Sequence, residues 1–278
     1  MINILAQGLD FPEGPAFAPD GRLWLVELKG GNLTRVAGGK LERFATDGAP
    51  NGLAFDHCGV AWFCDAGRNA IRTFDPTTGE FKTVVDSIDG APLFKPNDLA
   101  FDSAGNLVFT CPGDSRQEPT GYVCCLKPDG AVTKITTEKY FPNGLAFTAD
   151  GNKLVIAETY RHRLWEGRWD VANTRWLDAQ PWADVGAPPG PDGMAFGAAS
   201  GANGLLHVAV YRHGQIKTIN AAGEIVRTID LPGKNPTNVA FDPSGKLGMV
   251  VTEAEKGLLL SFPGSGSGAR LFDGRPLI

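Results

Sequence analysis

The chain has 278 residues and a formal net charge of −5, and it contains no cluster of Lys and Arg of the kind that binds nucleic acid. Its 36 glycines and 20 prolines make up about a fifth of the residues, against roughly 12% in average proteins, which argues against a helix bundle because these two are the poorest helix formers. A hydrophobic content of 42% excludes general disorder, so the composition predicts a globular all-β protein with many tight turns.

A short motif recurs six times along the chain. Its copies read EGPAF, NGLAF, NDLAF, NGLAF, DGMAF and TNVAF, and they end at Phe17, Phe55, Phe101, Phe147, Phe196 and Phe241. In most copies a glycine-containing turn follows, and then a second apolar run such as LWLV or KLVI. Two further strands are visible as NAIRTFD with FKTVV and as GYVCCLK with AVTKIT, so each unit predicts four strands.

Repeats of about 45 residues with four strands each are typical of propeller blades. The sequence therefore predicts a six-bladed β-propeller with four antiparallel strands per blade, and one domain over residues 1–278. Two terminal segments compete for the outer strand of the last blade, INILAQ at the beginning and ARLFD (269–273) near the end. We expect a terminal strand to close the ring.

Four residues before each of these phenylalanines, every copy has a side chain with an oxygen atom. The six residues are Glu13, Asn51, Asn97, Asn143, Asp192 and Thr237. The first strand of a propeller blade lines the central axis, so the residues that lead into it lie at one mouth of the channel. The six positions predict a ring of oxygen atoms around the axis.

A metal site is the interpretation that this set of residues favours. Asn-Gly is a favoured turn pair, so Asn51 and Asn143 alone would need no ligand. Glu13 and Asp192, however, would repel each other across an empty axis, and a divalent cation would neutralise both. Oxygen ligands favour Ca²⁺, Mg²⁺ or Mn²⁺ over a structural Zn²⁺, and so few protein ligands leave positions for water or substrate. We expect one divalent cation, with Ca²⁺ as first choice and Zn²⁺, Mn²⁺ or Mg²⁺ as alternatives.

The second strands of the blades run back toward the same mouth. They end at Glu27, Asp65, Thr110, Glu158, Tyr211 and Glu253. These side chains could orient the residues of the ring, as hydrogen-bonding partners of metal ligands commonly do. The alternative is that the acids form an exposed, solvated rim.

The repeated motifs closely resemble those of the gluconolactonase/regucalcin family of six-bladed propellers. The resemblance runs over nearly the whole chain, and the most specific stretch is GYVCCLKPDGAVTKITTEKYFPNGLAFTADGNKLVIAET. It implies that Glu13, Asn143 and Asp192 hold one divalent cation and that Asn97 contacts metal-bound water or substrate. Lys95 stands where regucalcin-like members have a substrate-binding Arg, and it offers a point charge in place of a bidentate fork.

The function implied by the resemblance is the metal-dependent opening of a sugar lactone to the sugar acid. Asp192 is the candidate general base because it could both touch the metal and reach a bound water. Asn97, Lys95 and Asn51 are the candidate substrate-binding residues.

Two other functions are open to the same residues. One is the hydrolysis of another ester or of an organophosphate, either a phosphotriester or a phosphofluoridate. The other belongs to a different class, a non-catalytic calcium-binding or interaction propeller. In an enzyme, Arg116 and Tyr122 could close over the substrate, and otherwise they are ordinary surface.

The remaining features indicate the surroundings in which we expect the protein to act. Five cysteines, with neither an even count nor CxxC spacing, favour reduced thiols. The first residues do not read as a signal peptide, and no apolar run reaches the length of a membrane span. We expect a cytoplasmic enzyme that is a monomer or a weak homo-oligomer, with a small sugar lactone as its partner and neither nucleic acid nor membrane.

Overall fold

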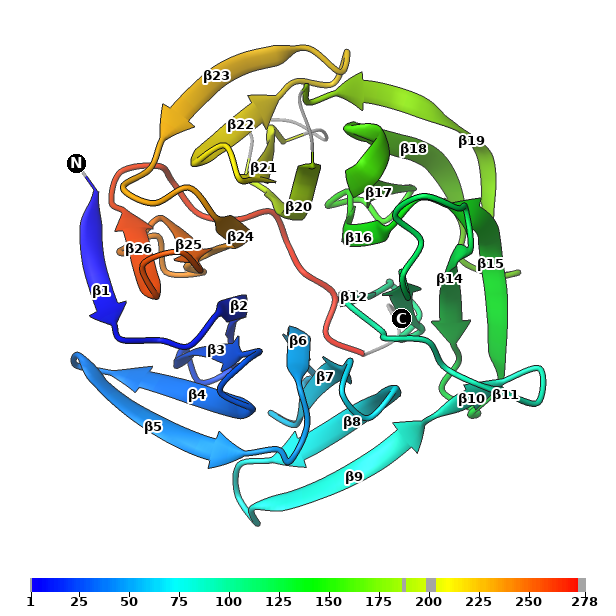
Figure 1. The fold of residues 1–278 in the computed structure, drawn as a ribbon, viewed down its shortest axis with the longest axis horizontal. Coiled ribbons are helices and arrows are strands. Elements are labelled where there is room, and N and C mark those ends of the chain that lie inside the picture. The colour runs from blue at the N-terminus through cyan, green and yellow to red at the C-terminus, as the bar shows by residue number, and fades with distance from the viewer. Residues whose placement is uncertain (1, 187–188, 199–203, 275–278) are drawn as a thin grey trace.

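The computed structural model describes residues 2–186, 189–198 and 204–274. Over these residues the chain forms six four-stranded antiparallel sheets arranged around a common axis, as Figure 1 shows. A small hairpin, β10 (Ser87–Ile88) with β11 (Ala91–Pro92), and a 3-10 turn, η1 (Thr159–Arg161), are added to this ring. The predicted six-bladed propeller is therefore confirmed.

The first strands of the blades carry the repeated motif and pack against one another around the axis. They are β2 (Pro12–Phe17), β6 (Pro50–Phe55), β12 (Leu99–Phe101), β16 (Pro142–Phe147), β20 (Gly190–Phe196) and β24 (Pro236–Phe241). The second strands are β3 (Leu23–Glu27), β7 (Ala61–Asp65), β13 (Leu107–Cys111), β17 (Lys153–Glu158), β21 (Leu206–Tyr211) and β25 (Met249–Glu253). These second strands are almost entirely buried because they lie between neighbours within the sheet and blades on both faces.

Exposure is greatest in the fourth, outermost strands. The third strands are β4 (Asn32–Ala37), β8 (Ala70–Asp75), β14 (Gly121–Leu126), β18 (Arg163–Asp170), β22 (Gln215–Ile219) and β26 (Leu258–Phe262). The fourth strands are β5 (Lys40–Ala45), β9 (Glu80–Val85), β15 (Val132–Lys139), β19 (Arg175–Asp184), β23 (Ile225–Asp230) and β1 (Asn3–Gln7). The fourth strand of the last blade thus comes from the beginning of the chain.

The ring is closed by the N-terminal segment. Strand β1 pairs antiparallel with β26, with Asn3 opposite Ser261 and Gln7 opposite Leu258. The competing segment, ARLFD, is not an outer strand. It crosses one end of the ring, where Phe272 forms an isolated bridge with Phe101 (Figure 1).

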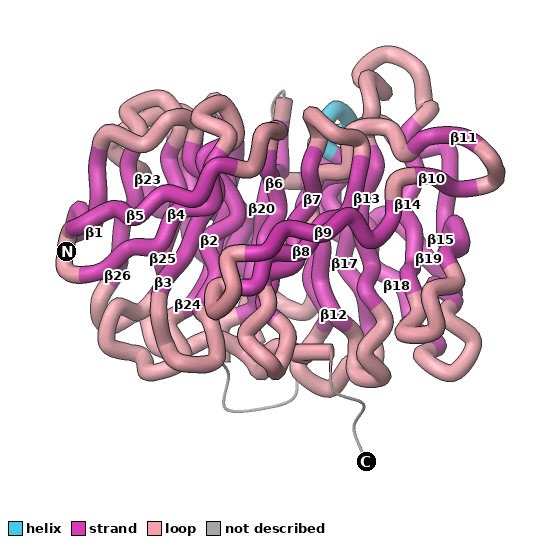
Figure 2. Tube along the Cα trace, turned by 90° about the horizontal axis from the view of Figure 1, so that it is seen from below, coloured by secondary structure: helices cyan, strands magenta, loops and turns pink. Residues whose placement is uncertain are grey.

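The two ends of the ring differ. At one end the first strands begin and the second strands end, as the pairing of Pro12 with Glu27 and of Pro50 with Asp65 shows. We call this the mouth end. The opposite end carries the hairpins between first and second strands and the crossing C-terminal segment, which Figure 2 shows from the side.

The core lies between the blades and is strongly aromatic. Trp24 is 1% exposed and packs against Phe55 of the next blade, with 5.7 Å between ring centroids. The five cysteines are free, and all but Cys58 are buried. The described residues contain no helix with the length and apolarity needed to cross a membrane.

Candidate metal and catalytic centre

The oxygen-bearing residues predicted from the repeat lie at the mouth end of the first strands. Glu13, Asn51, Asn143, Asp192 and Thr237 are each less than 9% exposed. In the five blades to which they belong, the pairing of the first and second strands is irregular at this point, for example between Pro142 and Leu145. Such irregularities release a residue from the regular alternation of a strand, which lets its side chain leave the plane of the sheet.

Two of the predicted acids, Glu13 and Asp192, come together in the buried centre with a third, Asp98. Burial raises the pKa of Glu13 well above its usual value, and the charges of Asp192 and Asp98 raise it further. Burial, and then the charge of Asp98, likewise raises the pKa of Asp192. Among the ion pairs formed by the described residues, none includes any of the three carboxyl groups. The centre is therefore rich in acid, and no described cationic side chain pairs with it.

Asp98 is the residue that the sequence reasoning missed. Burial raises its pKa to about 7, and its backbone N–H donates to Thr110 Oγ1 at 3.1 Å. The sequence does mark Asp98, through a departure from the repeat. At the position after each oxygen-bearing residue, four of the six copies have glycine. The two exceptions at that position are Asp98 and Asn238.

Asn238 connects the acids to one another. Its side chain donates hydrogen bonds that lower the pKa of both Glu13 and Asp98, against the larger effect of burial. Its Oδ1 accepts the N–H of Val239 at 2.7 Å, which fixes the direction of the amide. A β-carbon on Gly193 would lie 2.0 Å from Asn238 Cγ, so the neighbouring blade needs glycine there.

Asn143 is held by a threonine of its own blade, which is in turn bonded to the adjacent blade. Its Nδ2 donates to Thr159 Oγ1 at 3.1 Å, and a further hydrogen bond from Asn143 lowers the pKa of Asp192. The Thr159 hydroxyl in turn donates to the Pro191 carbonyl at 2.7 Å. Because the amide nitrogen is engaged, the amide oxygen is the atom that Asn143 can offer to a cation.

The other ring positions differ in what they can offer. The Thr237 hydroxyl is used at the seam between the last and first blades, 2.7 Å from the Pro12 carbonyl and 2.8 Å from Thr252 Oγ1. Asn97 is half-buried, and its backbone carbonyl accepts the Gly52 N–H at 2.6 Å. The six positions of the predicted ring are therefore not equivalent in the oxygen atoms that they can offer to a cation.

The acids at the ends of the second strands serve the loops that lead into the first strands. Glu27, Asp65, Glu158 and Glu253 are at most 1% exposed, so the interpretation as a solvated rim is wrong. Each accepts a backbone N–H from the loop in front of the first strand of its own blade, for example Asp65 from Ala49 and Glu158 from Tyr140. These four acids therefore fix the loops that lead to the prolines of the repeat. None of the hydrogen bonds given for them reaches a residue of the predicted oxygen ring.

Lys95 lies on the exposed side of the mouth end. Its Nζ forms an ion pair with Asp114 at 2.7 Å, so its charge is already matched. The Tyr122 hydroxyl accepts the N–H of Phe94 at 3.1 Å and thereby supports the same loop. Lys95 is thus on the exposed surface and engaged with a carboxylate outside the acid centre.

The chemistry of the donor set fits a hard divalent cation. Within the described ranges, no three side chains from His, Cys, Asp and Glu are arranged to hold a metal by themselves, so a site here requires amide oxygens as well. Glu13, Asp192 and Asn143 supply two carboxylates and one amide oxygen, the ligand types that Ca²⁺ and Mg²⁺ prefer. A bound cation would also favour the charged forms of the buried acids, which burial alone disfavours.

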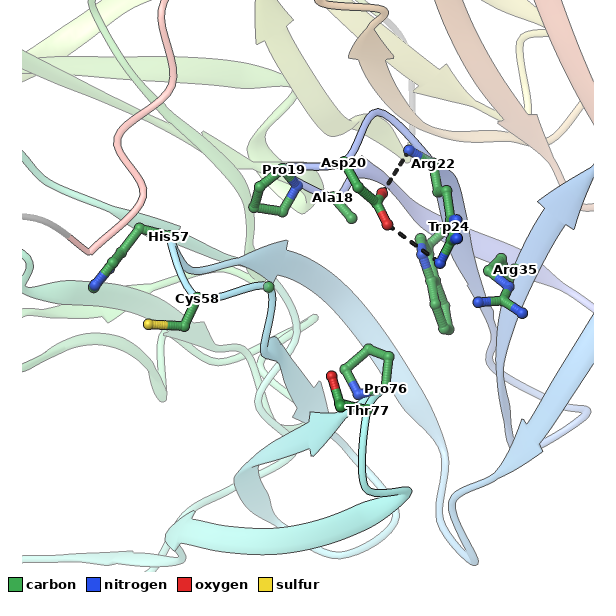
Figure 3. A pocket seen from close by; sticks show the side chains of 11 residues that line it. Ala18, Pro19, Asp20, Arg22, Trp24, Arg35, His57, Cys58, Pro76 and Thr77 are labelled. Atoms are coloured by element: carbon green, nitrogen blue, oxygen red, sulfur yellow. Dashed lines mark hydrogen bonds and ion pairs between the residues drawn. The ribbon is translucent and has the colours of Figure 1, made fainter.

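A separate cavity of about 360 Å³ lies at the opposite end of the ring (Figure 3). It is lined by the β2–β3 hairpin with Asp20, Arg22 and Trp24, and by His57 and Cys58 of the next blade. Arg22 pairs with Asp20 at 3.3 Å. Because this hairpin follows the C-terminal end of β2 whereas Glu13 is near its start, the cavity is not part of the acid centre.

Comparison with known proteins shows a consistent relationship. A family model described as the SMP-30/Gluconolactonase/LRE-like region matches residues 11–255. The chain is 30% identical over 186 residues to a gluconolactonase of Zymomonas mobilis, a match that covers 58% of this chain and only 52% of that protein. It is 29% identical to the diisopropyl-fluorophosphatase of Loligo vulgaris (91% and 83% covered) and 28% identical to the pentonolactonase XacC of Haloferax volcanii (87% and 81% covered).

Solved structures support the same fold. A luciferin-regenerating enzyme superposes with a TM-score of 0.86 at 19% identity, covering 100% of this chain and 99% of that one. A calcium-binding protein, regucalcin, of Agrobacterium tumefaciens superposes with a TM-score of 0.82 at 20% identity, covering 97% and 95%. At these identities the likeness bears on the fold alone.

Proposed function

Because the chain belongs to the SMP-30/gluconolactonase/LRE-like family, we propose that it is a metal-dependent lactonase that opens a sugar lactone to the corresponding sugar acid. The observation that carries the proposal is the buried group of three carboxyl groups at the mouth end, which forms no ion pair with any cationic side chain that the structure describes. Similarity to proteins named gluconolactonase and pentonolactonase supports the choice of substrate class.

Glu13, Asn143 and Asp192 are the residues that would hold the cation, with Ca²⁺ as first choice. Once bound, the cation supplies a Lewis acid for the lactone carbonyl and charge stabilisation for the oxyanion that develops. Asn97 and Asn51 flank these ligands on neighbouring blades and would orient the substrate through their amide groups.

The chain's own part in the reaction is the handling of a proton. Asp192 accepts a proton from the attacking water as the water oxygen bonds to the carbonyl carbon. The ring C–O bond then breaks, and the leaving oxygen receives that proton to become a hydroxyl. The other product is a carboxylic acid, which ionises to the carboxylate by releasing the second proton of the water to solvent. Asn238 and Asn143, which donate to the acids, hold Glu13 and Asp192 in the orientation needed for these steps.

The test is acid release from a panel of aldono-1,4- and 1,5-lactones, with chelator and after metal is restored. We expect turnover that requires metal, and a loss of about 100-fold or more in kcat/KM for Glu13→Gln and Asp192→Asn. Asp129→Asn, an exposed acid in a turn, is the control and should retain activity. If no lactone is opened above background in the metal-loaded protein, the lactonase proposal is wrong.

A second candidate is the hydrolysis of an organophosphate at the same centre. The match to the Loligo diisopropyl-fluorophosphatase, which covers 91% of this chain, favours including it. Fluoride release from a phosphofluoridate should be measured beside the lactones. Metal binding without turnover of either class would support the non-catalytic alternative.

A further inference from the structure

At the mouth end, the residue just before each proline of the repeat forms a second ring above the acid centre. These residues are Phe11, Ala49, Lys95, Phe141, Gly190 and Asn235. Phe11, Lys95 and Phe141 have φ values of 59°, 49° and 60°, a left-handed conformation that non-glycine residues rarely adopt. Such strain persists only where the surroundings enforce it, and it concentrates at functional sites.

The two phenylalanines of this second ring come from the first and fourth blades, which are opposite each other. The Phe11 ring lies 6.5 Å from the ring of Tyr211, which belongs to the fifth blade. Since the sixth blade stands between those two, the contact lies over the mouth end. Burial, and then the charge of Asp192, raises the pKa of Tyr211, which places this aromatic pair close to the acids.

On the opposite side, Arg116 lies over two aromatic rings. Its guanidinium carbon is 5.6 Å from the centroid of Phe141 and 5.8 Å from that of Tyr160. Phe141 precedes Asn143 by two residues, and Tyr160 follows Thr159, to which Asn143 donates. Arg116 therefore stacks on two residues that neighbour one of the proposed metal ligands along the chain or through its hydrogen-bond partner.

The loop that carries Arg116 is fixed to the same strand. Ser115 is fully buried, its hydroxyl donates to the Pro112 carbonyl at 2.6 Å, and it accepts the N–H of Phe141 at 2.9 Å. The Arg116 N–H donates to the Asp114 carbonyl at 2.7 Å. These bonds fix the backbone that carries Arg116, and the stacking of its guanidinium on two rings restrains the side chain, so part of the entropy that it would lose on binding a ligand is already lost.

Arg116 is exposed, and within the described part of the chain its guanidinium has no carboxylate partner. No ion pair among the described residues includes it, whereas the neighbouring Lys95 is paired with Asp114. A planar guanidinium recognises a carboxylate or a phosphate through two parallel hydrogen bonds. An anionic substrate would also need such a group, because the centre beneath it contains three acids.

We propose that Arg116 is a specificity residue that binds an anionic group on the substrate, so that the preferred lactone carries a carboxylate or a phosphate in addition to its ring ester. The inference rests on the proposed lactonase function and narrows its substrate class. The aromatic pair Phe11 and Tyr211 would cover the apolar side of the sugar ring at the opposite edge.

The experiment compares lactones that differ only at the carbon farthest from the ester, where one has a hydroxymethyl group, one a carboxylate and one a phosphate. The variants are Arg116→Gln and Arg116→Lys, with Arg161→Gln as the matched control, since Arg161 also stacks on an aromatic ring at the mouth end, that of Tyr140. KM and kcat are measured in the Ca²⁺-loaded protein at low and high salt.

We expect Arg116→Gln to raise KM for the anionic lactones about 10- to 100-fold and to change KM for the neutral lactone less than twofold, with kcat nearly unchanged. Arg116→Lys should recover only part of the loss, and Arg161→Gln should resemble the parent protein. The carboxylate and phosphate arms show which anion is preferred. If Arg116→Gln affects the neutral and anionic lactones equally, or neither, the inference is wrong.

A binding measurement separates this inference from the proposed function. Calorimetry with an open-chain sugar dicarboxylate and a sugar-acid phosphate, on Ca²⁺-loaded protein, does not require turnover. Loss of binding in Arg116→Gln supports the anion site even if no lactone is opened, which would overturn only the lactonase proposal. Equal binding by Arg116→Gln and the parent overturns the anion site and leaves the lactonase proposal standing.

Discussion

The carboxylate of Asp98 occupies the space beside Gly52 that a side chain would fill. A β-carbon on Gly52 would lie 2.4 Å from Asp98 Oδ1 and 2.6 Å from its Cα, contacts that real β-carbons do not make. Gly52 of the second blade therefore leaves the space that the Asp98 carboxylate of the third blade occupies. The same relationship recurs between Gly193 and Asn238, so the two polar residues at this position are each accommodated by a glycine.

We accordingly predict that Gly52→Ala displaces Asp98 and weakens metal binding at least about tenfold, the effect typical of losing a partner of a metal ligand. Overpacking at this site should also cost roughly 1–3 kcal/mol of unfolding free energy. Calorimetric titration with Ca²⁺ and thermal unfolding measure the two effects. Gly197→Ala is the control, since a β-carbon there would meet nothing closer than 3.3 Å. Unchanged Ca²⁺ affinity in Gly52→Ala would show that Asp98 does not depend on this contact.

The fold could be predicted from the sequence because the motif of the first strand occurs once in each of the six blades. Each copy of the motif places a proline, an oxygen-bearing residue and a phenylalanine at fixed distances, and the phenylalanines mark the blades independently of any single residue. The centre was only partly predictable. Asp98 was not predicted because it lies one residue after the oxygen-bearing position of the motif. At that following position most copies have glycine, which offers no ligand atom in its side chain. Thr237 occupies the oxygen-bearing position, but its hydroxyl donates to the Pro12 carbonyl where the last blade meets the first. A residue in the predicted position is therefore not always available as a ligand.

Long-range partners were beyond the reach of the sequence. Nothing in the neighbourhood of Lys95 indicates that Asp114, 19 residues away, matches its charge. Which terminal segment closes the ring depended on pairing with β26, and both candidates have suitable patterns. The choice rests on a strand register that joins residues more than 250 positions apart, such as Asn3 and Ser261.

The metal-free protein should lose stability as the pH rises from about 4 to about 8. Burial raises the pKa of Asp98 from 3.8 to about 7 and raises that of Glu13 and Asp192 as well. A group whose pKa is higher in the folded state favours folding below its unfolded pKa, and this contribution is lost as the pH passes the folded pKa. Thermal unfolding of chelated protein across this range measures the slope.

Two comparisons identify the groups responsible for that slope. Excess Ca²⁺ should largely abolish it, because a bound cation favours the charged carboxylates. Asp98→Asn should flatten it in the metal-free protein, whereas Asp129→Asn should leave it as it is. A chelated protein whose unfolding temperature does not fall between pH 5 and pH 8 would contradict the assignment of raised pKa values to these acids.

Removing residues 2–7 should open the ring at its seam. The deletion exposes the edge of β26, which is otherwise paired with β1, and it removes Ala6 from the core. We expect the unfolding temperature to fall by roughly 10 °C and self-association to increase, because an unpaired strand edge is a template for other chains. The control is Ile4→Thr, which changes a side chain that is 57% exposed and keeps the strand. If the shortened protein stays monomeric and keeps the unfolding temperature of the parent, β1 does not stabilise the closed ring.

Two buried threonine hydroxyls link neighbouring blades. Thr159 accepts from Asn143 and donates to the Pro191 carbonyl, whereas Thr237 lies 2.7 Å from the Pro12 carbonyl and does not contact Asn143 through any bond described. Replacing either with valine keeps the shape and leaves a buried carbonyl without its donor, at a cost of about 1–3 kcal/mol. Only Thr159→Val also frees the amide of Asn143 to turn. We therefore expect similar losses of stability in the two variants but a loss of Ca²⁺ affinity of about tenfold or more in Thr159→Val alone.

Chemical denaturation measures the stability of the two variants, and calorimetric titration measures their Ca²⁺ affinity. Equal Ca²⁺ affinities in the two variants would remove Asn143 from the proposed ligands.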